Sequence, residues 1–264
     1  MKEVEIGGAK KAFMPLRRSY SGSLHFTKPK SFANPMRLDV EMVNEAFEFA
    51  FQMTFGHEGS HRDHRSGGSA HRKLGEIFAH TFQGKAVECA VSDFLAQNRI
   101  ETEVDFSVSG LGYWDSGDLC VGDKVISVKS AKYFSNLLLL EANDWDTDGL
   151  YRPGNGSSSS RHDFFVMGRL RPDIASLMKK HRFYYSNALD RTELEEPVLN
   201  QPWSYDIPGF ISIDDLKTIV QKGQLIHKGV RLGTKGVRMD ATNYYVQTGD
   251  MRPISELVSV LSQA

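Results

Sequence analysis

The sequence lacks the features of secreted, membrane-spanning and strongly charged proteins. Its 264 residues include two cysteines, Cys89 and Cys120, too few for a disulfide scaffold and typical of a reducing cytoplasm. No apolar run approaches the ~20 residues that span a bilayer, and no apolar stretch follows the first lysines as in a signal peptide. Lys and Arg (32) nearly balance Asp and Glu (33), which excludes a basic tail and an acidic disordered chain. We therefore expect a cytoplasmic protein without a membrane segment.

The residues that are present indicate an α/β fold in one domain, residues 1–264. Hydrophobic residues make up 40% of the chain, enough for a sizeable core. Apolar residues at helical spacing predict helices over 39–55, 71–98 (with Gly84 as a candidate break), 172–182 and 213–221, and one starting near Ser255. Alternating and β-branched runs predict strands over 103–109, 117–121, 124–130 and 163–169. Prolines indicate an irregular arm over 1–40 and an extended loop over 190–210.

The segment 84–141 holds residues suited to phosphodiester hydrolysis. Glu88 lies on a predicted helix, Asp118 begins a strand, and Lys129 lies on the next strand. Hydrolysis assisted by a divalent metal needs carboxylates to hold Mg²⁺ and a cation to stabilise the developing charge. Two adjacent strands of a hairpin supply both kinds of group, and the helix adds a third ligand.

This order of residues resembles a known superfamily. A helix glutamate, then Gly-Asp-Leu at 117–119, then Ser-Val-Lys at 127–129 is similar to the PD-(D/E)XK nucleases, particularly type II restriction endonucleases. Asp-Phe-Phe-Val at 163–166 resembles a later core strand of such enzymes. The resemblance implies a mixed sheet flanked by helices, with a catalytic core over about 71–182. It also implies a Mg²⁺-dependent, site-specific endonuclease that cuts double-stranded DNA with metal-activated water and leaves a 5′-phosphate.

The match departs from the superfamily pattern at two positions. Gly117 replaces the proline, and Ser127 occupies the acidic position two residues before the lysine. Some restriction enzymes with a Ser-Val-Lys variant recruit a glutamate from the following helix to replace that acid, and here Glu141 is the candidate; Glu88 is the alternative. By resemblance, Asp118 is the central metal ligand, Lys129 orients the water, and Glu88 or Glu141 completes the metal site.

A competing motif, His57-Glu58-Gly59-Ser60-His61, matches the H-E-x-x-H pattern of zinc peptidases. In such enzymes the two histidines share one helical face. Here glycines interrupt the segment and no apolar stripe flanks it, so a helix is not expected. A zinc peptidase therefore remains an alternative function, as does a catalytically inactive DNA-binding module of the nuclease fold.

Two basic segments are candidates for contacts with DNA. The first segment precedes the helix that carries Glu88, and the second lies near the C-terminal end without any acidic residue over 216–238. Their side chains suit phosphate oxygens and base edges. The predicted DNA-binding residues are Arg62, Arg65, Ser66, Arg72, Lys228, Arg231, Lys235 and Arg238. Cutting both strands of a symmetric site further implies a homodimer, since the two-fold symmetry of protein and DNA would then match.

Overall fold

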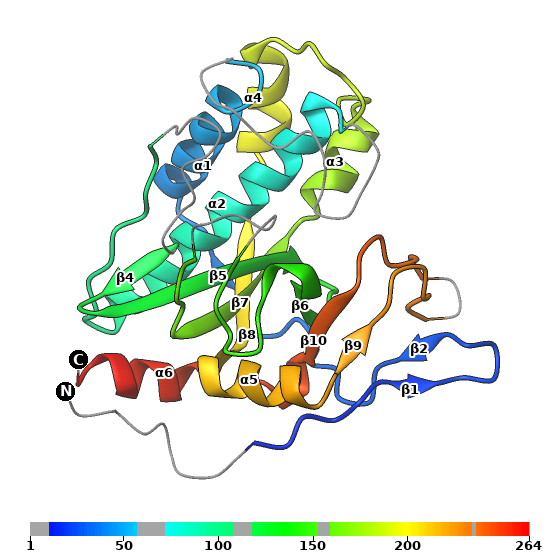
Figure 1. The fold of residues 1–264 in the computed structure, drawn as a ribbon. Coiled ribbons are helices and arrows are strands. Elements are labelled where there is room, and N and C mark those ends of the chain that lie inside the picture. Colours follow the sequence, from blue (N-terminus) through cyan, green and yellow to red (C-terminus); the bar gives the residue numbers. More distant parts are fainter. Residues whose placement is uncertain (1–10, 57–71, 108–117, 153–158, 234–235, 264) are drawn as a thin grey trace.

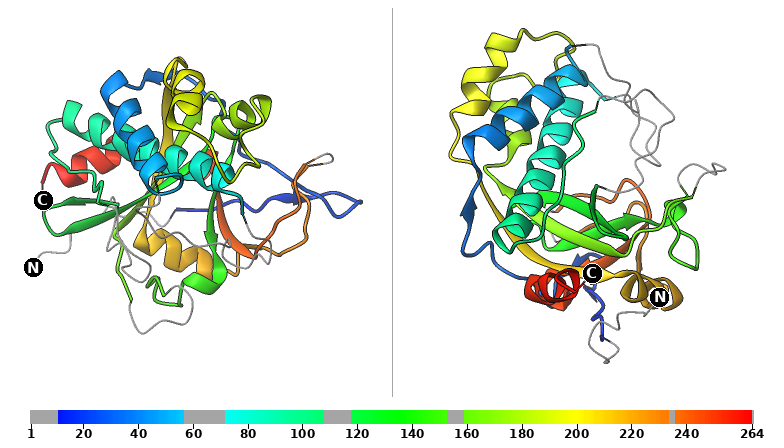
Figure 2. Two further views of the ribbon diagram at one scale, coloured as in Figure 1. Left: turned by 90° about the horizontal axis from the view of Figure 1, so that it is seen from above. Right: turned by 90° about the vertical axis from the view of Figure 1, so that its left-hand side faces the viewer.

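The computed structural model describes residues 11–56, 72–107, 118–152, 159–233 and 236–263 (Figure 1). These ranges form a mixed α/β fold around a five-stranded sheet with the strand order β3-β8-β7-β5-β4. Helices α1 to α4 gather on one side of that sheet, and two smaller sheets with α5 lie on the other (Figures 1 and 2). The predicted α/β class is confirmed. Within the described ranges, no helix is long and apolar enough to cross a bilayer.

The helical layer forms where the sequence places apolar residues at helical spacing. Helix α1 (Val40–Gln52) begins at Asp39, whose carboxylate accepts the backbone N–H of Glu41. Helix α2 (Leu74–Gln97) runs unbroken through Gly84, so the candidate break there does not occur. Its side chain Val87 packs against Gly168, where a Cβ atom would lie 2.3 Å from Val87 Cγ1. Gly168 therefore allows α2 to approach the sheet closely.

The two faces of the central sheet pack against two different hydrophobic cores. Strand β4 (Leu119–Val121) pairs antiparallel with β5 (Lys124–Lys132), and β5 pairs parallel with β7 (Phe164–Arg171). Strand β8 (Ser204–Ser212) is antiparallel to β7 and to β3 (Met36–Arg37). Ile126 and Val128 belong to the core that contains α2. Because side chains alternate along a strand, Ser127 and Lys129 lie on the opposite face.

That opposite face is covered by a second layer. Strands β6 (Leu137–Glu141), β10 (Asn243–Gln247) and β9 (Leu225–Ile226) form a three-stranded sheet, followed along the edge by α5 (Ile213–Gln221). Leu138 and Leu140 of β6 pack in one core with Phe165 and Met167 of β7. The remaining elements are β1 (Arg17–Arg18), β2 (Leu24–His25), α3 (Ile174–Lys180), α4 (Arg191–Leu199) and α6 (Ile254–Leu261).

Two predictions of secondary structure were wrong. Residues 190–210 are not a loop, because Asp190 and Glu193 form a capping box that starts α4, and β8 follows. Pro208 is tolerated in β8 because the register with β7 shifts beside it, between the pairs Met167–Gly209 and Arg169–Asp206. Residues 103–107 form no strand, although their alternation suggested one. Val104 packs on the helical core and Phe106 lies edge-on to Phe49 instead.

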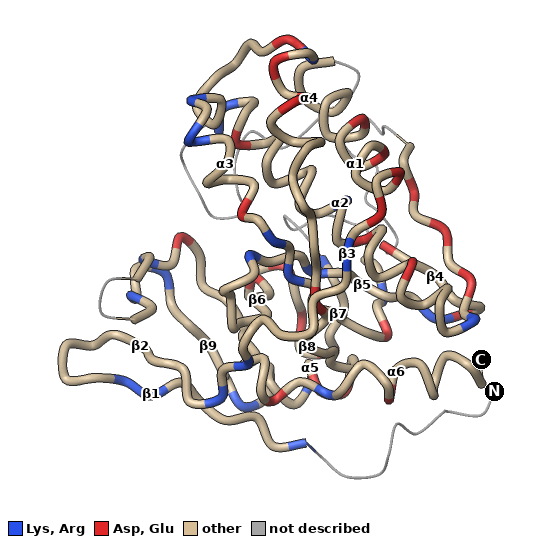
Figure 3. Tube along the Cα trace, turned by 180° about the vertical axis from the view of Figure 1, so that it is seen from behind, with Lys and Arg blue, Asp and Glu red and all other residues tan. Residues whose placement is uncertain are grey.

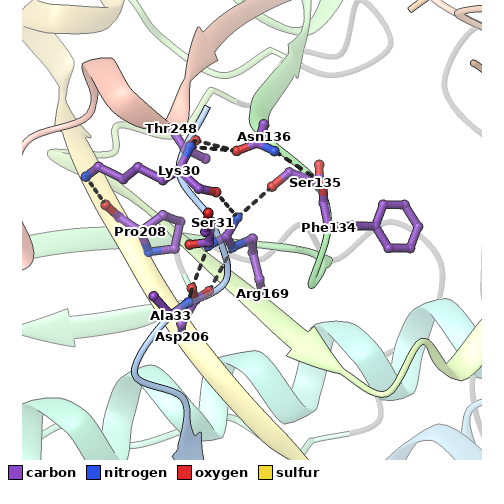
Figure 4. Close-up of polar contacts among 10 residues, drawn as sticks. All are labelled: Lys30, Ser31, Ala33, Phe134, Ser135, Asn136, Arg169, Asp206, Pro208 and Thr248. Atoms are coloured by element: carbon purple, nitrogen blue, oxygen red, sulfur yellow. Dashed lines mark hydrogen bonds and ion pairs between the residues drawn. The ribbon is translucent and has the colours of Figure 1, made fainter. Parts of the chain in front are cut away.

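A buried arginine helps to bind the N-terminal segment to the sheet. Arg169 of β7 is 1% exposed and forms an ion pair with Asp206 of β8. Its Nη1 and Nη2 atoms also donate to the backbone carbonyls of Lys30, Ser31 and Ser135 at 2.8–3.0 Å (Figure 4). All five guanidinium N–H groups therefore have acceptors, which is the condition under which a buried arginine is tolerated.

We expect Arg169→Met to lower the free energy of unfolding by about 3–5 kcal/mol, because it leaves Asp206 buried without its cation. Chemical denaturation measures this loss. Arg171→Met is the matched control, since Arg171 lies on the same strand but is exposed and its guanidinium contacts the ring of Tyr133. A loss no larger than that of Arg171→Met would contradict the assigned role of Arg169.

Candidate active site

Asp118 lies where strand β4 begins, and its carboxylate is held against β5. The backbone N–H of Val128 and the hydroxyl of Ser127, the latter at 3.2 Å, both donate to Asp118 Oδ2. The Asp118 N–H in turn donates to the carbonyl of Ile126 at 3.2 Å. The Asp118 carboxylate thus accepts the hydrogen bond of the Val128 N–H group, which lies just beyond the last residue pair of β4 and β5. It is fixed directly beside the position where the superfamily pattern has its second acid.

Lys129 follows Ser127 by two residues on β5 and therefore lies on the same face of the sheet. Its side chain is half-buried. The short β4–β5 hairpin that brings Asp118 and Ser127 together turns at Gly122, whose φ of 56° falls in the left-handed region. The sequence prediction that Asp118 and Lys129 belong to adjacent strands of one hairpin is consistent with this placement.

A residue that the sequence did not single out, His162, lies on this face as well. It is 5% exposed, and its ring lies 5.8 Å from Trp145, 5.9 Å from Tyr151 and 5.9 Å from Phe165. Burial and the positive charge of Lys129 lower the pKa of His162 to about 4, against an opposing effect of Asp118. No sequence signal marks His162, because a single histidine before a strand carries no pattern.

Glu88 does not join this group. It forms an ion pair with Lys85 on the same helix at 2.5 Å, and Lys85 also donates to the carbonyl of Asp105 and lies 4.5 Å from the centre of the Phe49 ring. Helix α2 covers the face of the sheet that bears Val128, whereas Lys129 is on the other face. Glu88 is therefore engaged in the contact between α2 and α1.

Glu141 is separated from Asp118 in a different way. It is the last residue of β6, opposite Asn243 of β10. Leu138 and Leu140 point into the core that faces the central sheet, so strand alternation places Glu141 on the other side of β6. Among the described residues, no three His, Cys, Asp or Glu side chains gather as metal ligands. The structure does not bring Asp118, Glu88 and Glu141 together.

The donor set around Asp118 fits Mg²⁺ only as a site completed by substrate. Mg²⁺ is commonly held by one or two carboxylates together with water and substrate phosphates, and not by an all-protein cage. Asp118 supplies one carboxylate, and an open groove beside it is lined by Glu101, Glu103 and Asp105. This acidic surrounding favours a cation near Asp118.

The predicted DNA-contacting residues divide into two groups. Arg62, Arg65, Ser66 and Lys235 lie outside the described residues, as does the His57–His61 motif. Arg72 is half-buried just before α2.

Lys228, Arg231 and Arg238 lie on the connection between β9 and β10, where Arg231 and Arg238 face each other as bridge partners.

This connection lies beside the β1–β2 hairpin. The Leu24 N–H donates to the carbonyl of Arg231 at 2.9 Å, and both segments project from the same end of the molecule (Figures 1 and 2). Strand β1 adds two exposed arginines that the sequence analysis did not count as DNA-binding (Figure 3). We refer to Arg17, Arg18, Lys228, Arg231 and Arg238 as the basic arm.

The pKa of His162 predicts a specific dependence of stability on pH. The folded-state pKa of about 4 lies below the ordinary value of 6.5, so the unfolded chain binds a proton that the folded chain does not. The contribution of His162 should therefore lower the free energy of unfolding by about 3 kcal/mol in total as the pH falls from 6.5 to 4.

Denaturation at pH 7 and pH 4 tests this for wild type and His162→Phe, with exposed His181→Phe as control. His162→Phe should lose less stability on acidification than wild type, and His181→Phe should behave as wild type. Equal losses in all three proteins would contradict the burial of His162.

Comparisons with known proteins give no relative. No protein-family model matches the chain, no curated protein matches it in sequence, and no solved structure matches it. The function must therefore be inferred from the site formed by Asp118, Ser127 and Lys129.

Proposed function

We propose that this protein is a Mg²⁺-dependent endonuclease that hydrolyses phosphodiester bonds in double-stranded DNA, built on a restriction-endonuclease-like core. The observation that carries the proposal is the β4–β5 hairpin. Asp118 is hydrogen-bonded to Ser127, and Lys129 lies two residues further on the same face. This is the spatial relation that the Asp…Ser-Val-Lys motif requires, with Ser127 at the position of the second acid.

In the proposed reaction, Asp118 and Lys129 would have different roles. Asp118 would hold Mg²⁺ jointly with a phosphate oxygen of the DNA; when bound, the ion supplies a Lewis acid that polarises the phosphoryl group and favours ionisation of water. The ammonium group of Lys129 would stabilise the negative charge that develops on the phosphoryl oxygens as water attacks. The water oxygen would form a bond to phosphorus as the bond to the 3′ oxygen breaks; the 3′ oxygen would leave as a hydroxyl with a proton from water, and the phosphate would stay on the 5′ end.

The basic arm supports DNA as the substrate. Its five cationic side chains come from two hairpins that are hydrogen-bonded side by side, so they lie at one end of the molecule although they are far apart in sequence. Clustered Lys and Arg side chains bind the DNA backbone through phosphate contacts. A homodimer would present two such arms and two sites to a symmetric DNA sequence.

An inactive DNA-binding module of the same fold is the second candidate. The position of Glu141 favours it, because the glutamate that was expected to replace the acid at Ser127 lies on the far side of β6 from the central sheet. This candidate predicts DNA binding without cleavage, and the cleavage experiment separates the two.

We expect purified protein to cut mixed-sequence plasmid and phage DNA into discrete fragments only when Mg²⁺ is present. Asp118→Ala and Lys129→Met should each lower the cleavage rate by about 10²-fold or more, because each removes a group that acts on the transition-state charge. Asp123→Asn is the matched control, since Asp123 lies in the turn of the same hairpin with its side chain 71% exposed. Cleavage that survives Asp118→Ala would overturn the assigned site, and binding without any cleavage would favour the inactive module.

Substitution of the basic arm should weaken DNA binding without regard to sequence. We expect the double variant Arg17→Ala/Arg231→Ala to reduce the slope of log K against log salt concentration by about 0.9 for each DNA phosphate that the arm no longer neutralises. Fluorescence anisotropy with a labelled duplex at several salt concentrations measures this slope. Arg191→Ala, on α4, is the control because its guanidinium pairs with Glu48 and Glu195 in the helical layer. An unchanged slope in the double variant would exclude the basic arm from the DNA interface.

A further inference from the structure

His162 carries a buried polar atom without a partner. No described group forms a hydrogen bond with its Nδ1 atom, and the side chain is 5% exposed among Trp145, Tyr151 and Phe165. An unsatisfied buried polar atom destabilises a protein, and a phenylalanine would fill the same aromatic surroundings without that cost. Packing alone therefore does not account for a histidine here.

The ring lies beside the Asp118–Lys129 site. It contacts Phe165, which is the neighbour of Ser127 across the β5–β7 pairing, and Ser127 donates to Asp118. Asp118 and Lys129 both act electrostatically on His162. His162, two residues before β7, thus lies on the same face of the sheet that Ser127 and Lys129 present from β5.

The surroundings also fix which nitrogen carries the proton. Beside Lys129 and out of water, the imidazole is neutral at pH 7 and bears one proton. A proton on Nδ1 would be a buried donor without an acceptor, which is rarer in proteins than an unused acceptor. The proton therefore belongs on Nε2, which makes Nε2 the N–H donor of the ring and leaves Nδ1 as the unused acceptor.

We propose that His162 is a third member of the Asp118–Lys129 site and donates a hydrogen bond from Nε2 to a phosphate oxygen of the substrate. The inference rests on the proposed phosphodiesterase function. A neutral donor suits this place, because a second positive charge there would be repelled by Lys129, whereas the dipole of a buried N–H group stabilises the phosphoryl charge without adding a charge of its own. The cost of the unpartnered Nδ1 is then tolerated because the other nitrogen serves the reaction.

The test compares His162→Phe and His162→Gln with wild type, and uses the exposed His181→Phe as control. We expect His162→Phe to be at least as stable as wild type at pH 7 and to lower kcat of Mg²⁺-dependent duplex cleavage about 10²-fold with little change in KM. His162→Gln, which keeps an N–H donor, should recover part of that loss, and His181→Phe should be unaffected.

A second readout is the tautomer itself, from long-range ¹H–¹⁵N spectra of the histidines, with the His162 signals assigned by their loss in His162→Phe. Nε2 should be protonated, and its signal should shift when a short duplex is added to the Asp118→Asn variant, which prevents cleavage.

The outcomes separate the two proposals. Unchanged kcat in His162→Phe while wild type cuts DNA, or a proton on Nδ1, overturns the role of His162 and leaves the nuclease intact. A wild type that neither binds nor cuts DNA overturns both. Lower activity accompanied by an equal loss of folding stability would assign His162 a structural role only.

Discussion

The buried guanidinium of Arg169 holds the N-terminal segment and the turn after β5 against the face of the sheet that carries the candidate site. Its side chain leaves β7 on the same face as Phe165 and Met167, which is the face of Ser127 and Lys129. From there it holds Asp206 of the next strand and three backbone carbonyls from the N-terminal segment and the turn after β5. A buried guanidinium with every N–H used tolerates only one arrangement of these segments, so it fixes their positions as well as stabilising them.

The basic arm depends on the same set of contacts. On the N-terminal side of Lys30, the segment is held by the buried Gln247. Its side chain accepts from the N–H groups of Thr27 and Lys28 and donates to the carbonyl of Met14. The segment between these points forms the β1–β2 hairpin, and Leu24 then pairs with the connection between β9 and β10. Two distant parts of the chain that carry Lys and Arg thereby lie side by side, while Asp and Glu concentrate on α1, α4 and the chain leading to β4 (Figure 3).

Sequence patterns were informative where local chemistry decides the structure. Helical spacing and the cap at Asp39 located α1, and Gly122-Asp123 located the turn that brings Asp118 to β5. The proline count misled over 190–210, because the capping box and the register shift beside Pro208 were stronger determinants than the prolines. The three expected metal ligands, Asp118, Glu88 and Glu141, do not come together for a similar reason. The pairing of β6 with β10 sets the face on which Glu141 lies, and Glu88 belongs to a helix on the face of the central sheet opposite Lys129. Neither placement can be predicted from the spacing of these residues along the chain.

His162 shows a different limit of sequence reasoning. Its environment is made by Trp145, Tyr151 and Phe165, which come from a loop and a strand that meet only in the folded chain. The unpartnered nitrogen is a property of that packing, and the residue alone gives no sign of it. In the proposed site, Asp118 supplies a carboxylate, Lys129 a cation and His162 a neutral donor, a combination suited to an anionic substrate that contributes ligands to the metal ion.

The proposed site requires that Asp118 and a DNA phosphate hold the metal ion together. Electron paramagnetic resonance of Mn²⁺, used as a substitute for Mg²⁺, measures this directly when wild type and Asp118→Asn are titrated with and without a phosphorothioate duplex that resists cleavage. We expect weak Mn²⁺ binding by the free protein, tighter binding when the duplex is present, and loss of that gain in Asp118→Asn. Equal Mn²⁺ affinity with and without duplex, or an Asp118→Asn variant that binds as wild type does, would contradict that requirement.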